Sequence, residues 1–386
     1  MGITHVESFA LRYQTEKSSQ EQTDNYYLPS EGWRSIYSRH HETMVVRITT
    51  SDGIVGYGEG QSPVSPRTSK TIVEDLCRPI LMGTDPFDVE YLWQRMFTAM
   101  RERGHYTGFF IDALAGCDIA LWDIIGKSTG KPVHKVLGGR YRDRIPLYAG
   151  VGGSTPEVAA AQAAKHVSQG YGGLKIHSTH GRAEILEIVA AVREQVGPQV
   201  KLMVDLHTQY SVPEATLLGR GLEKLDVMWL ESPTAPEDIP GQAALAQALD
   251  MSVAIGEWTR TRYELREVFE RRACDITMPD IARTGLTEGK RIASLADVYN
   301  IPVTPHIGGG GILSIAATVQ FSATIPNFLI MEHSPEAYES KGQITTRKPI
   351  VEDGAFVIDD VPGLGVDIDT EALEAFTISS EYTSPY

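Results

Sequence analysis

Cysteine is scarce in this sequence, which has only Cys77, Cys117 and Cys274 among 386 residues. The three lie far apart, whereas the cysteines of zinc sites and of disulfide frameworks come in closely spaced sets. The spacing therefore argues against a thiolate metal site and against a disulfide scaffold. We interpret all three as buried thiols.

Positive charge and long apolar runs are also in short supply. The chain has 35 lysines and arginines against 50 acidic residues, a formal net charge of −15, and contact with nucleic-acid phosphates needs a basic surface. No apolar run approaches the roughly 18 residues that cross a bilayer. The first 17 residues lack the basic start and apolar core of a signal peptide. We expect no nucleic-acid partner, no membrane association and a cytoplasmic location.

Residues 1–140 have the pattern of an α+β domain. Two β-rich runs at residues 44–50 and 54–58 flank a Ser-Asp-Gly sequence, which is a strong hairpin signal. Apolar residues then recur at helical spacing through residues 87–100 and 111–125. The pattern predicts a small sheet followed by helices.

A polar segment at residues 14–39 interrupts this domain and contains Tyr26, Tyr27, Trp33 and Tyr37. Such a long polar loop within a compact domain is often functional. We expect it to close over a bound substrate, with Tyr26 and Trp33 in contact with that ligand.

Residues 141–355 alternate between short apolar runs and helical stretches, which is typical of repeated βα units with a parallel sheet. We predict a (β/α)7β barrel, a modified TIM barrel, to which residues 1–140 form a capping domain. The final residues, 356–386, are expected to return to that domain. The eight runs are PLYAGVG, GLKIH, KLMVDLH, VMWLES, VAIGEW, DITMPD, PVTPHI and NFLIMEH.

Polar or ionisable residues close nearly all of these runs. The carboxyl ends of barrel strands form one ring around the mouth, so these side chains are expected to converge. The alternative is that strands simply end in polar residues where they meet solvent, but carboxylates and histidines recur where Ser, Asn or Gly would serve. The closing residues are Lys175, His177, Asp205, His207, Glu231, Glu257, Asp280, His306 and Glu332.

Asp205, Glu231 and Glu257 close three successive runs. Three hard oxygen ligands without cysteine suit Mg²⁺, which leaves positions open for water or substrate oxygens. A divalent ion would also relieve the repulsion between the three like charges. The alternative is a set of surface carboxylates with salt-bridge partners.

Asp280 and His306 close the next two runs, where an aspartate can orient a histidine for general base or acid work. Lys175 and His177 lie two apart on one strand and so share a face. There Lys175 could neutralise a substrate carboxylate and His177 could reach an α-proton opposite His306, although core packing is an alternative role for His177.

His207 lies two residues after Asp205, and we expect it to share that face. It could protonate a leaving hydroxyl or only hydrogen-bond the substrate. Glu332 on the eighth strand could hydrogen-bond the substrate or close the ring structurally. Residues 308–311 are four glycines without the lysine or spacing of a phosphate loop, so we interpret them as a close-approach loop beside the substrate.

The chain resembles the mandelate racemase subgroup of the enolase superfamily over almost its full length. The resemblance is carried by ALAGCDIALWDIIGKSTGKPVHKVLGG and by VDLH, WLESP, IGE, MPDIARTGL and TPHIGGG in family order. It implies magnesium ligation by Asp205, Glu231 and Glu257, an Asp280–His306 dyad, and an enediolate stabilised by the metal and Lys175. It also implies a homo-oligomer, from dimer to octamer.

Two departures from the subgroup pattern bear on the reaction. The subgroup commonly has Lys-x-Lys on the second strand, whereas here Lys175 is followed by His177. The Asp-x-His at Asp205 and His207 is similar to galactonate and mannonate dehydratases, where this histidine is an acid toward the departing hydroxyl.

We therefore expect a dehydratase of aldonates or aldarates that forms a 2-keto-3-deoxy acid. The alternatives are a racemase, epimerase or lactone cycloisomerase of the same superfamily, and a metabolite-binding barrel without catalysis.

Overall fold

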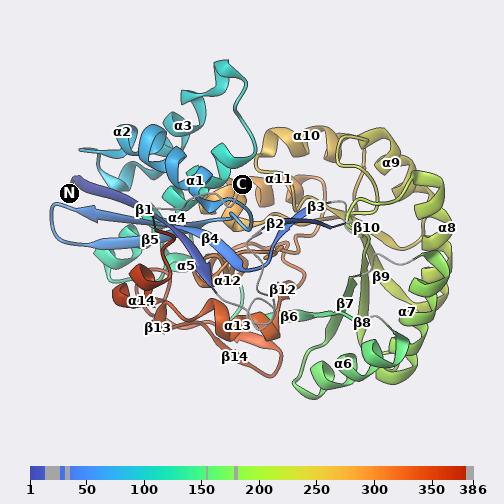
Figure 1. Ribbon diagram of the computed structural model, residues 1–386. Coiled ribbons are helices and arrows are strands. Elements are labelled where there is room, and N and C mark those ends of the chain that lie inside the picture. The colour runs from blue at the N-terminus through green and yellow to red at the C-terminus, as the bar shows by residue number, and fades with distance from the viewer. Residues whose placement is uncertain (14–26, 31–34, 154, 178–180, 380–386) are drawn as a thin grey trace.

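A three-stranded antiparallel sheet begins the chain in the computed structural model, which describes residues 1–13, 27–30, 35–153, 155–177 and 181–379. The hairpin predicted in this sheet is confirmed, with Gly53 in the left-handed region at φ +80°. A separate two-stranded hairpin lies between the first and second strands of this sheet in the sequence, and it is directed toward the barrel in Figure 1. The sheet has the order β1 (Ile3–Tyr13), β4 (His41–Thr50), β5 (Val55–Gly60), and the hairpin pairs β2 (Tyr27–Ser30) with β3 (Ser35–Ser38).

Helices cover one face of this sheet. The helices predicted at residues 87–100 and 111–125 are confirmed as α3 and α4. The longest, α4, packs directly on β5 because alternate residues of that strand are glycine. A Cβ on Gly56, Gly58 or Gly60 would come within 2.1–2.3 Å of a carbonyl oxygen of α4. The helical segments are α1 (Pro66–Ile72), η1 (Val73–Cys77), α2 (Arg78–Leu81), η2 (Pro86–Asp88), α3 (Val89–Ala99), η3 (Arg101–Arg103), α4 (Phe109–Thr129) and α5 (Val133–Val136).

Parallel strands alternating with outer helices follow, as predicted, and make an α/β barrel (Figure 1). The eighth run closes the ring because β12 pairs with β6. The strands are β6 (Arg144–Val151), β7 (Gly173–His177), β8 (Lys201–Asp205), β9 (Val227–Glu231), β10 (Ser252–Ile255), β11 (Ile276–Thr277) and β12 (Met331–His333). The helical segments are α6 (Pro156–Ser168), α7 (Arg182–Val196), α8 (Val212–Leu222), η4 (Glu223–Leu225), α9 (Ile239–Ala248), α10 (Arg262–Glu270), α11 (Ile281–Val298) and α12 (Ile312–Thr324).

The seventh predicted run, residues 302–307, occupies its place in the ring without forming a regular strand. Pro302 and Pro305 have no backbone N–H, so the run cannot complete a ladder of hydrogen bonds. Isolated bridges join Val303 to Thr277 on one side and to Phe328 on the other. Backbone hydrogen bonds still link the run to both neighbours, such as Thr304 N–H to the Thr277 carbonyl and Leu329 N–H to the Val303 carbonyl, so the barrel is closed here without a regular ladder.

The chain after β12 adds small elements to the barrel and then reaches β1. The strand β15 pairs antiparallel with β6, and the backbone N–H of Ile378 donates to the carbonyl of Ala10 at 2.8 Å. The predicted domain boundaries stay a prediction, and the one at residue 355 would cut β15. The elements are α13 (Pro335–Lys341), β13 (Thr345–Arg347), β14 (Ile350–Glu352), β15 (Ala355–Val357), β16 (Asp367–Ile368) and α14 (Thr370–Ala375).

Three apolar clusters form the core. One lies between the capping sheet and its helices, one fills the barrel interior around Tyr148, Met203 and Trp229, and the largest lies between the strands and the outer helices. The three cysteines are buried and free, as predicted. In the described part of the chain no helix combines the length and apolarity needed to cross a membrane.

Gly58→Ala is expected to destabilise the protein by about 1–3 kcal/mol, because the added methyl meets the Gly116 carbonyl oxygen at 2.1 Å. Gly172→Ala is the control, since a Cβ there has no atom within 4 Å. Urea unfolding midpoints measure both, and equal midpoints would show that the close approach of β5 to α4 has no energetic weight.

Candidate active site

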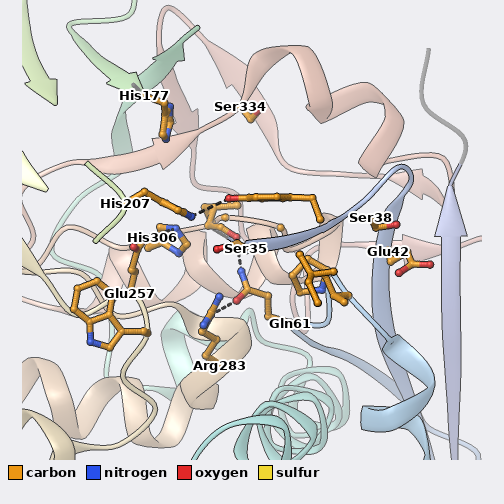
Figure 2. Close-up of a pocket in the computed structure, with 18 of the residues that line it drawn as sticks. Ser35, Ser38, Glu42, Gln61, His177, His207, Glu257, Arg283, His306 and Ser334 are labelled. Carbon is orange, nitrogen blue, oxygen red and sulfur yellow. Dashed lines mark hydrogen bonds and ion pairs between the residues drawn. The ribbon is translucent and has the colours of Figure 1, made fainter. Parts of the chain in front are cut away.

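A cavity of about 710 Å³ opens at the carboxyl ends of the barrel strands, beneath the β2–β3 hairpin and the end of β5. Figure 2 shows His177, His207 and His306 on the barrel side and Ser35, Ser38 and Gln61 on the capping side. Tyr26 and Trp33 lie outside the described residues. Of the other predicted site residues, the structure places His177, Asp205, His207, Glu257, His306 and Glu332 in the cavity lining.

The three predicted metal ligands come together at the cavity floor. Strand pairing sets Asp205 beside Glu231, and carboxylate oxygens of Asp205, Glu231 and Glu257 all lie within 4.8 Å of one another. Glu257 follows β10 by two residues, after Gly256 at φ +127°, so it projects from a turn and not from the strand. The group could hold a metal ion, and its oxygen donors suit Mg²⁺.

Lys175 lies beneath these carboxylates and is fully buried. Its Nζ is 2.5 Å from Glu231 Oε1, 2.7 Å from Glu332 Oε1 and 3.7 Å from Asp205 Oδ2. Burial opposes its charge, but Glu231 and Glu332 hold the pKa of Lys175 well above its usual value. Lys175 is therefore a fixed positive charge beneath the acidic floor, the name used here for the carboxylates of Asp205, Glu231, Glu257 and Glu332.

One lysine does not balance this many carboxylates. Burial raises the pKa of Glu231 to about 8; the attraction of Lys175 opposes this rise, and repulsion from Asp205, Glu257 and Glu332 adds to it. A carboxyl group that is protonated at neutral pH while it faces two other carboxylates marks a place where a cation is electrostatically favoured. The donor set and the charge of the site both fit a divalent cation.

Asp280 and His306 form the predicted pair, with His306 Nδ1 2.8 Å from Asp280 Oδ2. The other imidazole nitrogen, Nε2, lies 2.9 Å from Glu257 Oε2. Burial disfavours the imidazolium, but Glu332 and Glu257 raise the pKa of His306 well above its usual value. The ring is thus held between a buried aspartate and the acidic floor.

His177 approaches the same floor from β7, with Nε2 3.4 Å from Asp205 Oδ2. The ring passes over Gly150 on the neighbouring strand, where a Cβ would be 3.6 Å from it. Removal from bulk water, reinforced by Lys175, lowers the pKa of His177. His177 therefore favours the neutral form, whereas His306 favours the charged form.

His207 reaches the cavity differently from the prediction, which placed it on the third strand. The strand β8 ends at Asp205, and His207 and Thr208 take positive φ values of +49° and +63°. The turn is held because the His207 N–H donates to Asp205 Oδ1 at 2.9 Å. Backbone strain of this kind is typical of functional sites.

Tyr37 is a site residue that the sequence analysis did not select, although it lies in the polar segment 14–39. Its hydroxyl lies 2.9 Å from His207 Nε2, and it projects from β3. Its only sequence signal was membership of that segment. The hairpin thus places a capping-domain side chain against a barrel histidine.

Glu332 Oε2 accepts the Ile307 N–H at 2.8 Å, which fixes the carboxylate beside His306. Burial opposes ionisation, but Lys175 and His306 lower the pKa of Glu332 well below its usual range. Glu332 is thus both exposed to the cavity and part of the charged floor.

Comparisons with known proteins extend over both parts of the chain. The family model "Mandelate racemase / muconate lactonizing enzyme, N-terminal domain" matches residues 30–138, and "Enolase C-terminal domain-like" matches residues 158–372. A crystal structure titled as a putative isomerase from Sinorhizobium meliloti superposes with a TM-score of 0.91 at 33% identity, covering 97% of this chain and 98% of that one.

Curated relatives are similar over most of their length. A D-galactarolactone cycloisomerase of Agrobacterium fabrum is 34% identical, covering 86% of this chain and 90% of that protein. An arabinonate dehydratase of Saccharolobus solfataricus is 32% identical, covering 88% and 91%. A D-xylonate dehydratase of Haloferax volcanii is 31% identical, covering 88% and 86%.

Mg²⁺ is expected to stabilise the protein against heat, with an affinity that rises about tenfold per pH unit below pH 8 and levels off above it. The reason is that Glu231, with its pKa of about 8, must lose its proton before it can bind a cation. Calorimetric titration with Mg²⁺ from pH 6 to 9 measures this dependence.

Glu231→Gln should abolish most of the response to Mg²⁺. Glu288→Gln is the matched control, because Glu288 is equally buried but pairs with Arg262 away from the cavity. An unchanged affinity in Glu231→Gln, or one that does not vary with pH, would contradict the assignment.

Proposed function

The chain belongs to the mandelate racemase and muconate lactonizing enzyme family of the enolase superfamily, and we propose that it is a magnesium-dependent dehydratase of acid sugars. The observation that carries the proposal is that three histidines, His177, His207 and His306, line one cavity with the acidic cluster. Dehydration needs both a base for a proton and an acid for a leaving hydroxyl. Two of the relatives described above are named sugar-acid dehydratases.

We propose that Asp205, Glu231 and Glu257 hold Mg²⁺ and that the substrate carboxylate binds above them. The bound ion would supply Lewis-acid stabilisation of the charge that develops on that carboxylate. Lys175 contributes a fixed positive charge from below the floor, since it is buried against Glu231 and Glu332. Its role is electrostatic support for an enediolate.

The proton beside the carboxylate is removed by His177, or by His306 if a bound cation offsets the carboxylates that keep its ring charged. His177 has the lowered pKa and so the neutral ring that a base requires, whereas Asp280 orients His306 through Nδ1. His207 or His306 then gives a proton to the C3 hydroxyl, which leaves as water. The resulting enol becomes a 2-keto-3-deoxy acid when C3 takes up a proton.

Tyr37 supports the assignment of His207 as the acid, because its hydroxyl lies at hydrogen-bonding distance from Nε2. The capping hairpin would thus hold the imidazole over the substrate while it covers the cavity. We propose that this segment limits which sugar chains fit, in keeping with the cavity lining that β3 supplies.

The test is a panel of mono- and diacid sugars incubated with Mg²⁺ in D₂O. We expect loss of water from at least one member and one deuterium at C3 of the keto acid. Asparagine at His306 or His207 should lower kcat by about 10²–10⁴-fold, the range for general acid–base catalysis. The kcat of His177→Asn, measured under the same conditions, shows whether His177 or His306 is the base.

His166→Asn is the control, because His166 is a buried histidine of α6 outside the cavity lining, and it should keep kcat. Absence of any keto acid across the panel would overturn the dehydratase proposal.

Cycloisomerisation is the second candidate, because the D-galactarolactone cycloisomerase is 34% identical to this chain. That reaction and epimerisation share removal of the proton beside the carboxylate, so the same acidic floor serves them. Deuterium at C2 of recovered or isomerised substrate, without loss of water, would identify either one in the same panel.

A further inference from the structure

Gln61 is a buried amide that the capping domain places at the barrel mouth. It directly follows β5, is 2% exposed, and its backbone N–H donates to the Ala282 carbonyl at 2.9 Å. The glycines of β5 let this strand pack directly on α4. The backbone of Gln61 is therefore held through β5 by α4 and through its hydrogen bond to Ala282 by α11. Its side chain therefore has a defined direction, toward the start of α11.

That side chain contacts three barrel residues. Gln61 Nε2 donates to Asp280 Oδ2 at 2.9 Å and, at the longer distance of 3.4 Å, to the Ile307 carbonyl. Gln61 Oε1 accepts from Arg283 Nε (Figure 2). Guanidinium groups only donate and carboxylates only accept. The amide therefore has one satisfied orientation, with its N–H on Asp280 and its oxygen on Arg283.

These contacts complete the hydrogen bonds of Asp280, which is fully buried. Oδ1 accepts the Ala282 N–H at 2.9 Å, while Oδ2 is shared by His306 Nδ1 at 2.8 Å and the Gln61 amide. Without Gln61 the only donor left on Oδ2 would be the histidine. Apart from the Ala282 N–H on Oδ1 and Arg283 Nε at 4.0 Å, nothing else would then hold the plane of the carboxylate, and a tilt of that plane would shift the ring with it.

We propose that Gln61 is a positioning residue for the Asp280–His306 pair, supplied to the barrel by the capping domain. This rests on the proposed function in so far as His306 moves a proton during turnover. Gln61 acts through Asp280: it fixes the plane of the carboxylate, and the carboxylate fixes the ring. Catalytic groups displaced by about 1 Å can lose on the order of 10²-fold in rate.

The competing interpretation is that Gln61 only fills a polar gap between the two domains. Gln320 provides the comparison, because it is 3% exposed and its Oε1 accepts from the N–H of His134 at 2.8 Å. It joins α12 to α5 and does not line the cavity. Loss of a buried glutamine at a junction can thus be separated from loss of the contact to Asp280.

The first experiment compares Gln61→Glu, Gln61→Met and Gln320→Met by steady-state kinetics on a substrate from the panel. Gln61→Glu keeps the size of the side chain and an acceptor for Arg283 but removes the donor to Asp280. Both Gln61 variants are expected to lose about 10–100-fold in kcat with KM within about threefold of wild type. Gln320→Met should keep kcat, and wild-type kcat in Gln61→Glu would overturn the proposal.

The second experiment needs no substrate. In protein labelled with ¹⁵N-histidine, the Nδ1 proton on Asp280 should give a downfield imidazole signal that His306→Asn abolishes. We expect the signal to shift or vanish in both Gln61 variants and to persist in Gln320→Met. An unchanged signal in the Gln61 variants overturns the positioning role, whereas a wild type that converts no acid sugar overturns only the proposed function.

Discussion

Buried negative charge at the mouth of the barrel is the constraint on which the site depends. Asp205, Glu231, Glu257 and Glu332 share one floor, where they are buried away from bulk water and close to one another. Lys175 is the positive charge that the chain itself provides, and its Nζ lies within 3.7 Å of three of the four carboxylates. The remaining imbalance would favour a bound cation, and the nearby carboxylates raise the pKa of His306.

Much of the barrel and of this floor could be predicted from the sequence, because both follow from local patterns. Apolar runs that alternate with helical stretches specify βα units, and a strand end is a position that can be recognised by its sequence. Asp205, Glu231 and Asp280 could therefore be placed at one mouth before any coordinates, and family matches over residues 30–138 and 158–372 agree with that architecture.

Other features could not be predicted because they arise only when distant segments meet. The position of His207 depends on the left-handed backbone conformation of His207 and Thr208. Hydrophobic periodicity in the sequence does not indicate such a conformation. Prolines at 302 and 305 leave the seventh run with isolated bridges and separate backbone hydrogen bonds in place of a regular strand, an outcome that an apolar run does not reveal. Tyr37 and Gln61 act across the junction between the domains, so their relevance depends on tertiary contacts with His207 and Asp280.

The row of glycines on β5 has a consequence for recombining such enzymes. Because Gly56, Gly58 and Gly60 let α4 lie directly on the strand, β5 and α4 must be inherited together. The same strand continues into Gln61, which reaches Asp280. A chimaera that exchanges the whole capping domain would therefore also replace a neighbour of the Asp280–His306 pair, whereas a graft limited to the β2–β3 hairpin would leave that neighbour in place.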